Sequence, residues 1–183
     1  MNANKPPVKS IVSAAALAVL MSLATCGGGG SSSAAAGGGS GGGGGTLTIA
    51  AATPAANNTT LDLSNATTNG NDTRAADGFS STPYCEVFFE GFSGANGTTY
   101  SLQVYFRQSD AAALHATIVG GNPPTFIVFD NGAGNPITGI TVDTAARTIN
   151  FSNKVLSGSS GEVVTVNGSL TFPGNSGTPA CGA

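Results

Sequence analysis

The sequence predicts an all-β domain, an antiparallel β-sandwich or barrel, over residues 46–183. Apolar and polar residues alternate with a period of two in several segments, which is the pattern of half-buried strands. Gly, Asn and Pro residues typical of turns separate these segments at short intervals. Helical spacing is weak throughout: residues 110–116 come nearest to it, but they run into the β-branched segment 117–119.

The clearest alternation lies in residues 162–172. Its inward positions are apolar, namely Val164, Val166, Leu170 and Phe172. Gly168 falls on the same face, and a missing side chain there predicts a β-bulge or a close backbone contact. Ile140 and Val142 face Ile149 and Phe151 across a four-residue turn, which predicts a hairpin.

Three further strands are predicted, two from alternation and one from a continuous apolar run. Two inward rows lie on either side of a turn at residues 93–98, namely Cys85, Val87 and Phe89 before it, and Tyr100, Leu102, Val104 and Phe106 after it. Residues 125–129 are apolar on both faces, which predicts a central strand. Residues 53–82 are polar, so we expect mostly surface loop with one weak strand near residues 59–63.

The first 25 residues have the order of a secretory signal peptide. Lys5 and Lys9 precede an uncharged apolar run, residues 11–24. As a helix this run would span roughly 21 Å, which is short of the ~30 Å bilayer core. Cleavage after Ala24 would be compatible with simple secretion, and a retained membrane anchor is the remaining alternative.

The segment Leu23-Ala24-Thr25-Cys26 ends this signal, and residues 1–26 resemble a bacterial lipoprotein precursor. Thr25 stands where that class usually has Gly, Ala or Ser. The resemblance implies a mature chain that begins at Cys26 and carries acyl chains such as palmitate. Gly27 is not the Asp that retains such proteins in the inner membrane, so the resemblance implies the outer membrane, facing the periplasm or the cell surface.

Residues 26–45 form the second segment, the cysteine followed by a linker. Residues 27–45 contain only Gly, Ser and Ala. Such a chain behaves as a flexible coil with an r.m.s. span of about 24 Å. We expect a tether between the lipid and the β-domain.

Cysteine parity supports both the anchor and a disulfide. The chain has three cysteines, so acylation of Cys26 leaves Cys85 and Cys181 as a pair. A bridge between them would hold the Gly- and Pro-rich tail and stabilise the fold by up to ~4 to 5 kcal/mol. The alternative of a redox or metal pair lacks a CxxC spacing or a nearby histidine.

Charge and composition exclude several partners. After residue 25 the chain has four cations and nine acids, a net charge of −5. Four scattered cations cannot form a nucleic-acid surface or bind an anionic membrane, so only the lipid would attach the protein to the bilayer.

The polar segment with Asn69, Asn71, Asp72 and Asp77 does not match a calcium loop, and we expect neither metal nor cofactor.

One outward surface combines aromatic and titratable side chains. If the strands form a meander, alternation and simple registers place Glu86, Tyr105 and His115 in one outward row. The predicted contact surface consists of Tyr84, Glu86, Phe88, Glu90, Phe92, Tyr105 and His115. His115 should be solvated with a pKa of about 6.5. Alternatively, a second sheet or the 53–82 segment covers the aromatic residues.

These features favour a lipid-anchored, non-catalytic module of the cell envelope, with a binding or structural role. Its partner would be an envelope protein, a glycan or a small ligand. The alternative is a small envelope hydrolase or glycan-acting enzyme that uses Glu86 and Glu90, or His115. Acids on an open sheet lack the cleft that perturbs catalytic pKa values, so we expect no catalytic residues.

Overall fold

The computed structural model of this chain describes residues 43–120, 126–130, 134–174 and 181. Cys26, the signal peptide and all but the last three residues of the linker lie outside these ranges. Within them, no helix has the length and apolar character needed to cross a membrane. The strands are β1 (Gly44–Thr53), β2 (Thr59–Asp62), β3 (Thr68–Arg74), β4 (Tyr84–Ser93), β5 (Thr99–Arg107), β6 (Ala113–Gly120), β7 (Phe126–Asp130), β8 (Ile140–Asp143), β9 (Thr148–Ser157) and β10 (Val163–Thr171). Two short 3₁₀ turns, η1 (Ala55–Asn57) and η2 (Leu63–Asn65), complete the described elements.

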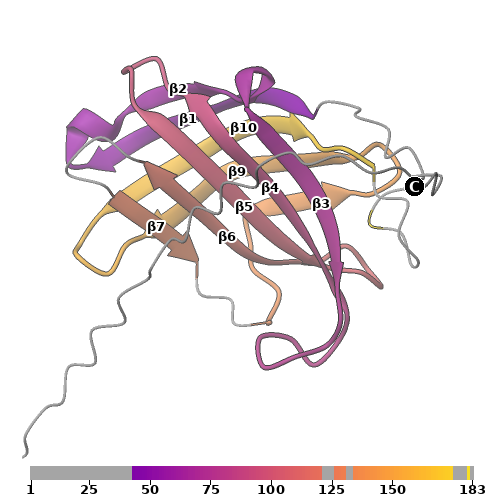
Figure 1. Ribbon diagram of the computed structural model, residues 1–183. Helices are drawn as coiled ribbons and strands as arrows, with labels where there is room; N and C mark the ends of the chain where they lie inside the picture. The colour runs from indigo at the N-terminus through magenta and orange to yellow at the C-terminus, as the bar shows by residue number, and fades with distance from the viewer. Residues whose placement is uncertain (1–42, 121–125, 131–133, 175–180, 182–183) are drawn as a thin grey trace, which may run out of the picture. The chain divides into compact units, whose positions relative to one another are not determined.

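The strands form an antiparallel β-sandwich, as predicted. Their order along the sheet is β2-β1-β10-β9-β7-β6-β5-β4-β3, and β8 also pairs with β9. Strands β3 to β6 form one layer, and β1, β2, β9 and β10 cross behind them (Figure 1). The layers join where β7 meets β9, through Phe129 and Ser157, the one register pair that the described residues show there.

The predicted inward rows form a shared core between these layers. Every member of the rows in residues 85–89, 100–106 and 164–172 that was predicted to face inward is buried, apart from Gly168. The rings of Phe106 and Phe172 meet across the layers, with centroids 5.8 Å apart. The predicted hairpin is also confirmed, because Ile140 pairs with Phe151 and Val142 with Ile149.

Gly168 makes both the bulge and the close contact that its position predicts. The register of β10 against β9 shifts between Val166 and Gly168. The glycine has φ +132°, and a Cβ built on it would lie 2.3 Å from the carbonyl oxygen of Thr46 on β1. A larger residue would therefore push β1 away from β10.

A disulfide joins Cys85 to Cys181, as predicted, with Cα atoms 5.7 Å apart. The disulfide ties Cys181 to the start of β4, where Cys85 is the second residue. The side-chain amide of Asn71 on β3 adds to this attachment by donating to the carbonyl oxygens of Pro173, at 3.2 Å, and Cys181. Pro173 and Cys181 are thus held to the β3–β4 edge of the sandwich by polar contacts and, at Cys181, by the disulfide.

Two element boundaries differ from the predictions. Residues 53–82 contain the predicted weak strand, as β2, but also the seven-residue strand β3, which was not predicted. β3 ends the strand order and pairs only with β4, and an edge strand of this kind can be polar. β1 begins at Gly44, two residues inside the predicted linker. The apolar segment 125–129 forms β7, which lies between β6 and β9, as predicted for a central strand. Residue 125, and the burial of the side chains of residues 126–129, lie outside what the structure describes.

Candidate functional site

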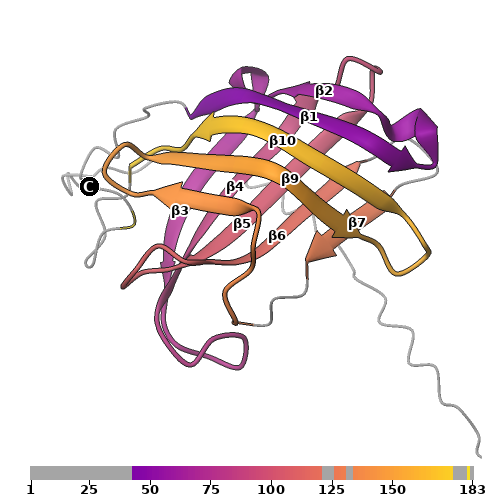
Figure 2. The same ribbon diagram turned by 180° about the vertical axis from the view of Figure 1, so that it is seen from behind.

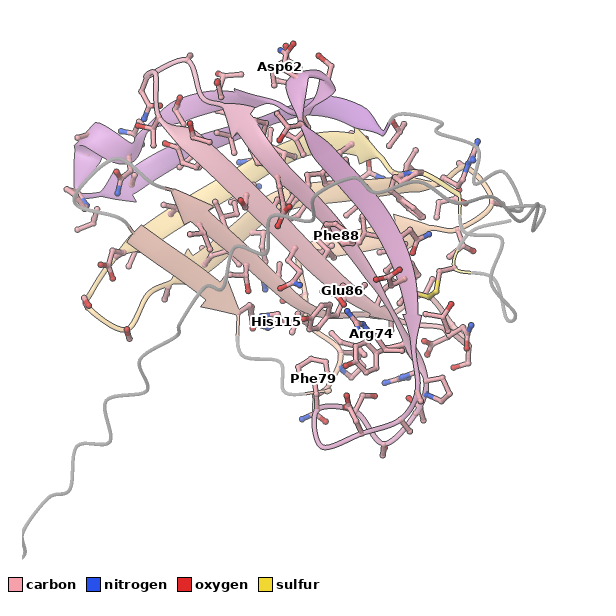
Figure 3. All side chains as sticks on the ribbon, viewed as in Figure 1. Asp62, Arg74, Phe79, Glu86, Phe88 and His115 are labelled. Carbon is pink, nitrogen blue, oxygen red and sulfur yellow. A yellow bond between two sulfur atoms is a disulfide. The ribbon has the colours of Figure 1, made fainter. Side chains whose placement is uncertain are left out.

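The front layer, β3 to β6, aligns the predicted contact residues in rows on its outer face. Glu86 on β4 pairs with Tyr105 on β5, which pairs with His115 on β6, so the predicted row is confirmed. The next row consists of Phe88, Gln103 and Thr117. Figure 3 shows Glu86, Phe88 and His115 on this face, with Phe79 and Arg74 near its lower end.

The side chains of this row are buried or half-buried, which corrects the expectation that His115 is solvated. Glu86 is only 7 % exposed and His115 is half-buried. Phe79, from the segment between β3 and β4, packs on Tyr105 and His115: its ring centroid lies 5.2 Å from that of Tyr105 and 5.8 Å from that of His115. The alternative that the 53–82 segment packs over the aromatic residues is confirmed for Tyr84, which Phe79 contacts, and for Phe88, which lies against Gly70.

Asp77 holds this covering segment in place. Its Oδ1 accepts hydrogen bonds from the backbone N–H groups of Phe79, at 2.8 Å, and Ser80, at 3.2 Å. These backbone donors hold the pKa of Asp77 below its usual value. On the far side, a Cβ at Gly134 would lie 2.3 Å from the carbonyl oxygen of Phe79, so only a glycine fits beside the segment.

Tyr84 and Tyr105 complete an aromatic cluster under Phe79. Their ring centroids are 5.4 Å apart, and Phe79 is 5.3 Å from Tyr84. Burial raises the pKa of Tyr84 to about 12, helped by the hydrogen bond that its hydroxyl donates to Asp77 at 2.9 Å. The pKa of Tyr105 is also raised, by burial first and then by the charge of Glu86. Both phenols are therefore neutral donors at physiological pH.

Glu86 is bound on both carboxylate oxygens. Nε of Arg74 donates to Oε2 at 2.5 Å, and the side-chain amide of Gln103 donates to Oε1. The hydrogen bond and charge of Glu86 raise the pKa of the Arg74 guanidinium. Glu86 thus fixes the orientation of the Arg74 and Gln103 side chains.

His115 also has both ring nitrogens engaged. Nδ1 lies 2.5 Å from the carbonyl oxygen of Asp130, and Nε2 lies 2.6 Å from the hydroxyl of Thr117. A carbonyl can only accept, so Nδ1 carries the proton and donates. Burial lowers the pKa of His115, so the ring is neutral, Nε2 accepts, and the hydroxyl of Thr117 donates to it.

The same network reaches the back layer through Asp130. Lys154 on β9 is 5 % exposed, forms an ion pair with the Asp130 carboxylate and donates to the carbonyl oxygen of Thr138 at 2.9 Å. A buried ammonium needs such partners, because an unpaired one is very costly. The pair reinforces the join between the layers, where β7 and β9 are weakly paired.

A shallow hollow of about 130 Å³ lies farther along the same face. Its lining residues come from three strands: Phe88, Phe89, Glu90, Ser101, Leu102, Gln103, Thr117 and Val119. Phe88 is half-buried and leans over β3. A Cβ at Gly70 would lie 2.3 Å from its Cζ, so the glycine leaves the room that the ring occupies.

One predicted contact residue, Phe92, does not join this surface as expected. Phe92 is fully buried, because a bulge between Phe89 and Phe92, with Gly91 at φ +67°, reverses the alternation and turns Phe92 toward Tyr100 in the core. Glu90 keeps its outward position and is exposed. Glu86 is thus bound inside the fold, whereas Glu90 faces solvent.

Several residues of the site were missed from the sequence. Arg74 and Phe79 lie in the segment taken as loop, where no pattern marked them. Gln103 had a usable signal, because it is an outward position between Leu102 and Val104 on a strand that was correctly predicted. Asp130 contacts His115 through its backbone carbonyl, which every residue carries, so the residue type did not indicate this contact.

The arrangement offers a hollow with both polar and apolar lining residues beside a partly buried hydrogen-bond network. Within the described ranges, no three or more His, Cys, Asp or Glu side chains are placed to hold a metal ion.

Comparison of the chain with protein-family models, curated proteins and solved structures finds no significant match to any of them.

Proposed function

We propose that this chain is a lipid-anchored protein of the outer membrane whose β-domain is a non-catalytic binding module. The order of charge and apolar residues up to Cys26, and its resemblance to lipoprotein precursors, support the anchor. The disulfide suits an oxidising compartment such as the periplasm or the cell surface. The partner is an envelope protein, a glycan or a small ligand that contacts the outer face of β4 to β6.

The observation that carries the non-catalytic role is the bonding of Glu86 and His115. His115 is the one histidine of the chain, and Glu86 is the one buried acid of the described part. A general base must have a free lone pair within reach of the substrate proton. Here the lone pair of the His115 ring accepts from Thr117, and Glu86 is bound by Arg74 and Gln103. Both groups serve to hold the surface rather than to move protons.

Intact mass of the protein extracted from native envelopes tests the anchor. We expect a chain that begins at Cys26 and carries acyl groups, and the Cys26→Ser variant should keep residues 1–25 and lose the acyl mass. An unmodified chain that begins at Thr25 would contradict the lipid anchor.

A second candidate, a hydrolase, is favoured by one observation. The hydroxyl of Thr117, the His115 ring and the orienting carbonyl of Asp130 have the order nucleophile, base and orienting group. Thr117 also lines the hollow. Such an enzyme needs N–H donors for an oxyanion, whereas the backbone of β6 around Thr117 is paired with β5 and β7 in the sheet.

Hydrolysis of p-nitrophenyl acetate by the mature protein separates the two candidates. The binding module predicts the same slow rate for the unaltered protein, Thr117→Val and His115→Gln. A rate that Thr117→Val and His115→Gln both abolish would establish the hydrolase and overturn the non-catalytic role.

A further inference from the structure

The hydrogen-bond network beside the hollow fixes which polar atoms the hollow offers to a ligand. Two chains of hydrogen bonds reach it, one from β3 and one from β7. Each begins at a group that can act in only one way, a guanidinium that only donates or a carbonyl that only accepts. The direction of every later bond follows from that starting point.

The first chain runs from Arg74 through Glu86 to Gln103. The guanidinium of Arg74 can only donate, so Oε2 of Glu86 accepts from it. Oε1 of the same carboxylate accepts a hydrogen bond from the side-chain amide nitrogen of Gln103. The amide oxygen of Gln103 therefore lies on the side away from Glu86, toward the rows that line the hollow, where it can only accept.

The second chain runs from Asp130 through His115 to Thr117. The backbone carbonyl of Asp130 takes the Nδ1 proton of His115, so Nε2 accepts and takes the hydroxyl proton of Thr117. That hydroxyl has no second proton to give. It offers lone pairs to anything that enters the hollow.

Glu90 adds the one formal charge among the lining residues, and Phe88 adds an aromatic ring. Among the described residues, the ion pairs of Arg74, Arg107 and Lys154 go to other carboxylates, so none of them neutralises Glu90. The hollow thus combines a carboxylate, two fixed acceptors and an aromatic side chain. This combination favours a cation with N–H donors, since both carboxylates and aromatic rings attract such groups.

We propose that the hollow binds the head of an organic cation, a primary ammonium or a guanidinium carried on a short alkyl chain, as in a lysine or arginine side chain. This inference rests on the proposed role as a binding module and names the chemistry of its ligand. Donors of the cation meet Glu90, the Gln103 amide oxygen and the Thr117 hydroxyl, and the alkyl part lies against Phe88 and Val119. The volume of about 130 Å³ suits one such group rather than a whole peptide or sugar chain.

A ¹H–¹⁵N NMR titration of the mature, full-length chain with n-butylammonium chloride tests this, at ionic strength held constant with sodium chloride. 1-Butanol is the uncharged control of similar size. We expect shifts at the amides of Phe88, Ser101, Gln103 and Thr117, with at least tenfold weaker binding of 1-butanol. Equal binding of both probes, or shifts confined to other parts of the domain, would overturn the proposal.

Charge variants sharpen the test. Glu90→Gln should weaken n-butylammonium binding at least fivefold, whereas Glu162→Gln, which removes a carboxylate from the turn between β9 and β10, should leave it unchanged. Equal losses in both variants would show general attraction to an acidic protein and overturn the site. Methyl glucoside serves as a third probe: if it alone shifts these amides, the cation proposal fails while the binding module stands.

Discussion

The two outer faces of the sandwich follow the same alternation and yet differ in how far their outward side chains are exposed. One register row crosses the back layer through five strands, from Asp62 and Thr46 to Ser169, Asn150 and Thr141, and all five residues are exposed. In the front layer, the row of Glu86, Tyr105 and His115 is buried or half-buried. The layers are seen from opposite sides in Figures 1 and 2.

The difference comes from the connections between strands. In the back layer β8 reaches β9, and β9 reaches β10, through short turns that do not fold over the face. In the front layer residues 75–83 connect β3 to β4 and lay Phe79 across the strands. An outward position is therefore solvated only where no connection covers it. A covered face can keep charged groups only by pairing them, which explains the bonds of Glu86.

The largest expected effect tests the core that both faces share. Phe172→Ala should lower the free energy of unfolding by about 3 to 5 kcal/mol, because the ring is 2 % exposed and packs on Phe106. Its neighbour Thr171 points outward, but its hydroxyl bonds to the backbone of Gly44. Thr171→Ala should cost about 0.5 to 1.5 kcal/mol. Urea denaturation measures both, and equal losses would refute the alternation.

The next effect compares the faces directly. Arg74→Ala leaves the buried Glu86 carboxylate with one partner fewer and should cost about 1 to 3 kcal/mol. Thr48→Ala, at an exposed position of the back layer, should change stability by less than ~0.5 kcal/mol. Similar values for the two variants in urea denaturation would mean that the pairing on the front face contributes nothing.

A smaller effect should appear in acid. Burial lowers the pKa of His115, so the unfolded chain binds a proton more readily than the folded protein does. Stability should be complete above pH ~6.5, the ordinary histidine value, and should fall as the pH drops from there toward the lower folded-state pKa. The His115→Gln variant should lose this part of the pH profile. An identical acid profile in the variant would show that His115 is not desolvated.

Much of the fold was predictable because burial leaves a direct trace in sequence. Inward rows such as the one from Tyr100 to Phe106 must be apolar, and the period of two follows from strand geometry. The disulfide was predictable from parity, since only Cys85 and Cys181 remain after Cys26 is assigned to the lipid. Strand β3 was not, because a polar edge strand looks like a loop.

The site was predictable only in part. Alternation and register placed Glu86, Tyr105 and His115 side by side, which the pairing of β4, β5 and β6 confirms. Their burial depended on Phe79, whose position is set by the fold of one connection around Asp77. The misplacement of Phe92 has a similar origin, because a single bulge reverses the alternation beyond it. Local turn and bulge geometry thus limits prediction of an outer face.

The most direct test of the account is the protonation of His115, because the direction of the network and the acceptor character of the hollow depend on it. Long-range ¹H–¹⁵N NMR spectra of the one histidine, recorded across the acid range, give the tautomer and the pKa without assignment. The account predicts a neutral ring protonated on Nδ1, with a pKa below 6.5. A neutral ring protonated on Nε2, or a pKa at or above 6.5, would contradict it.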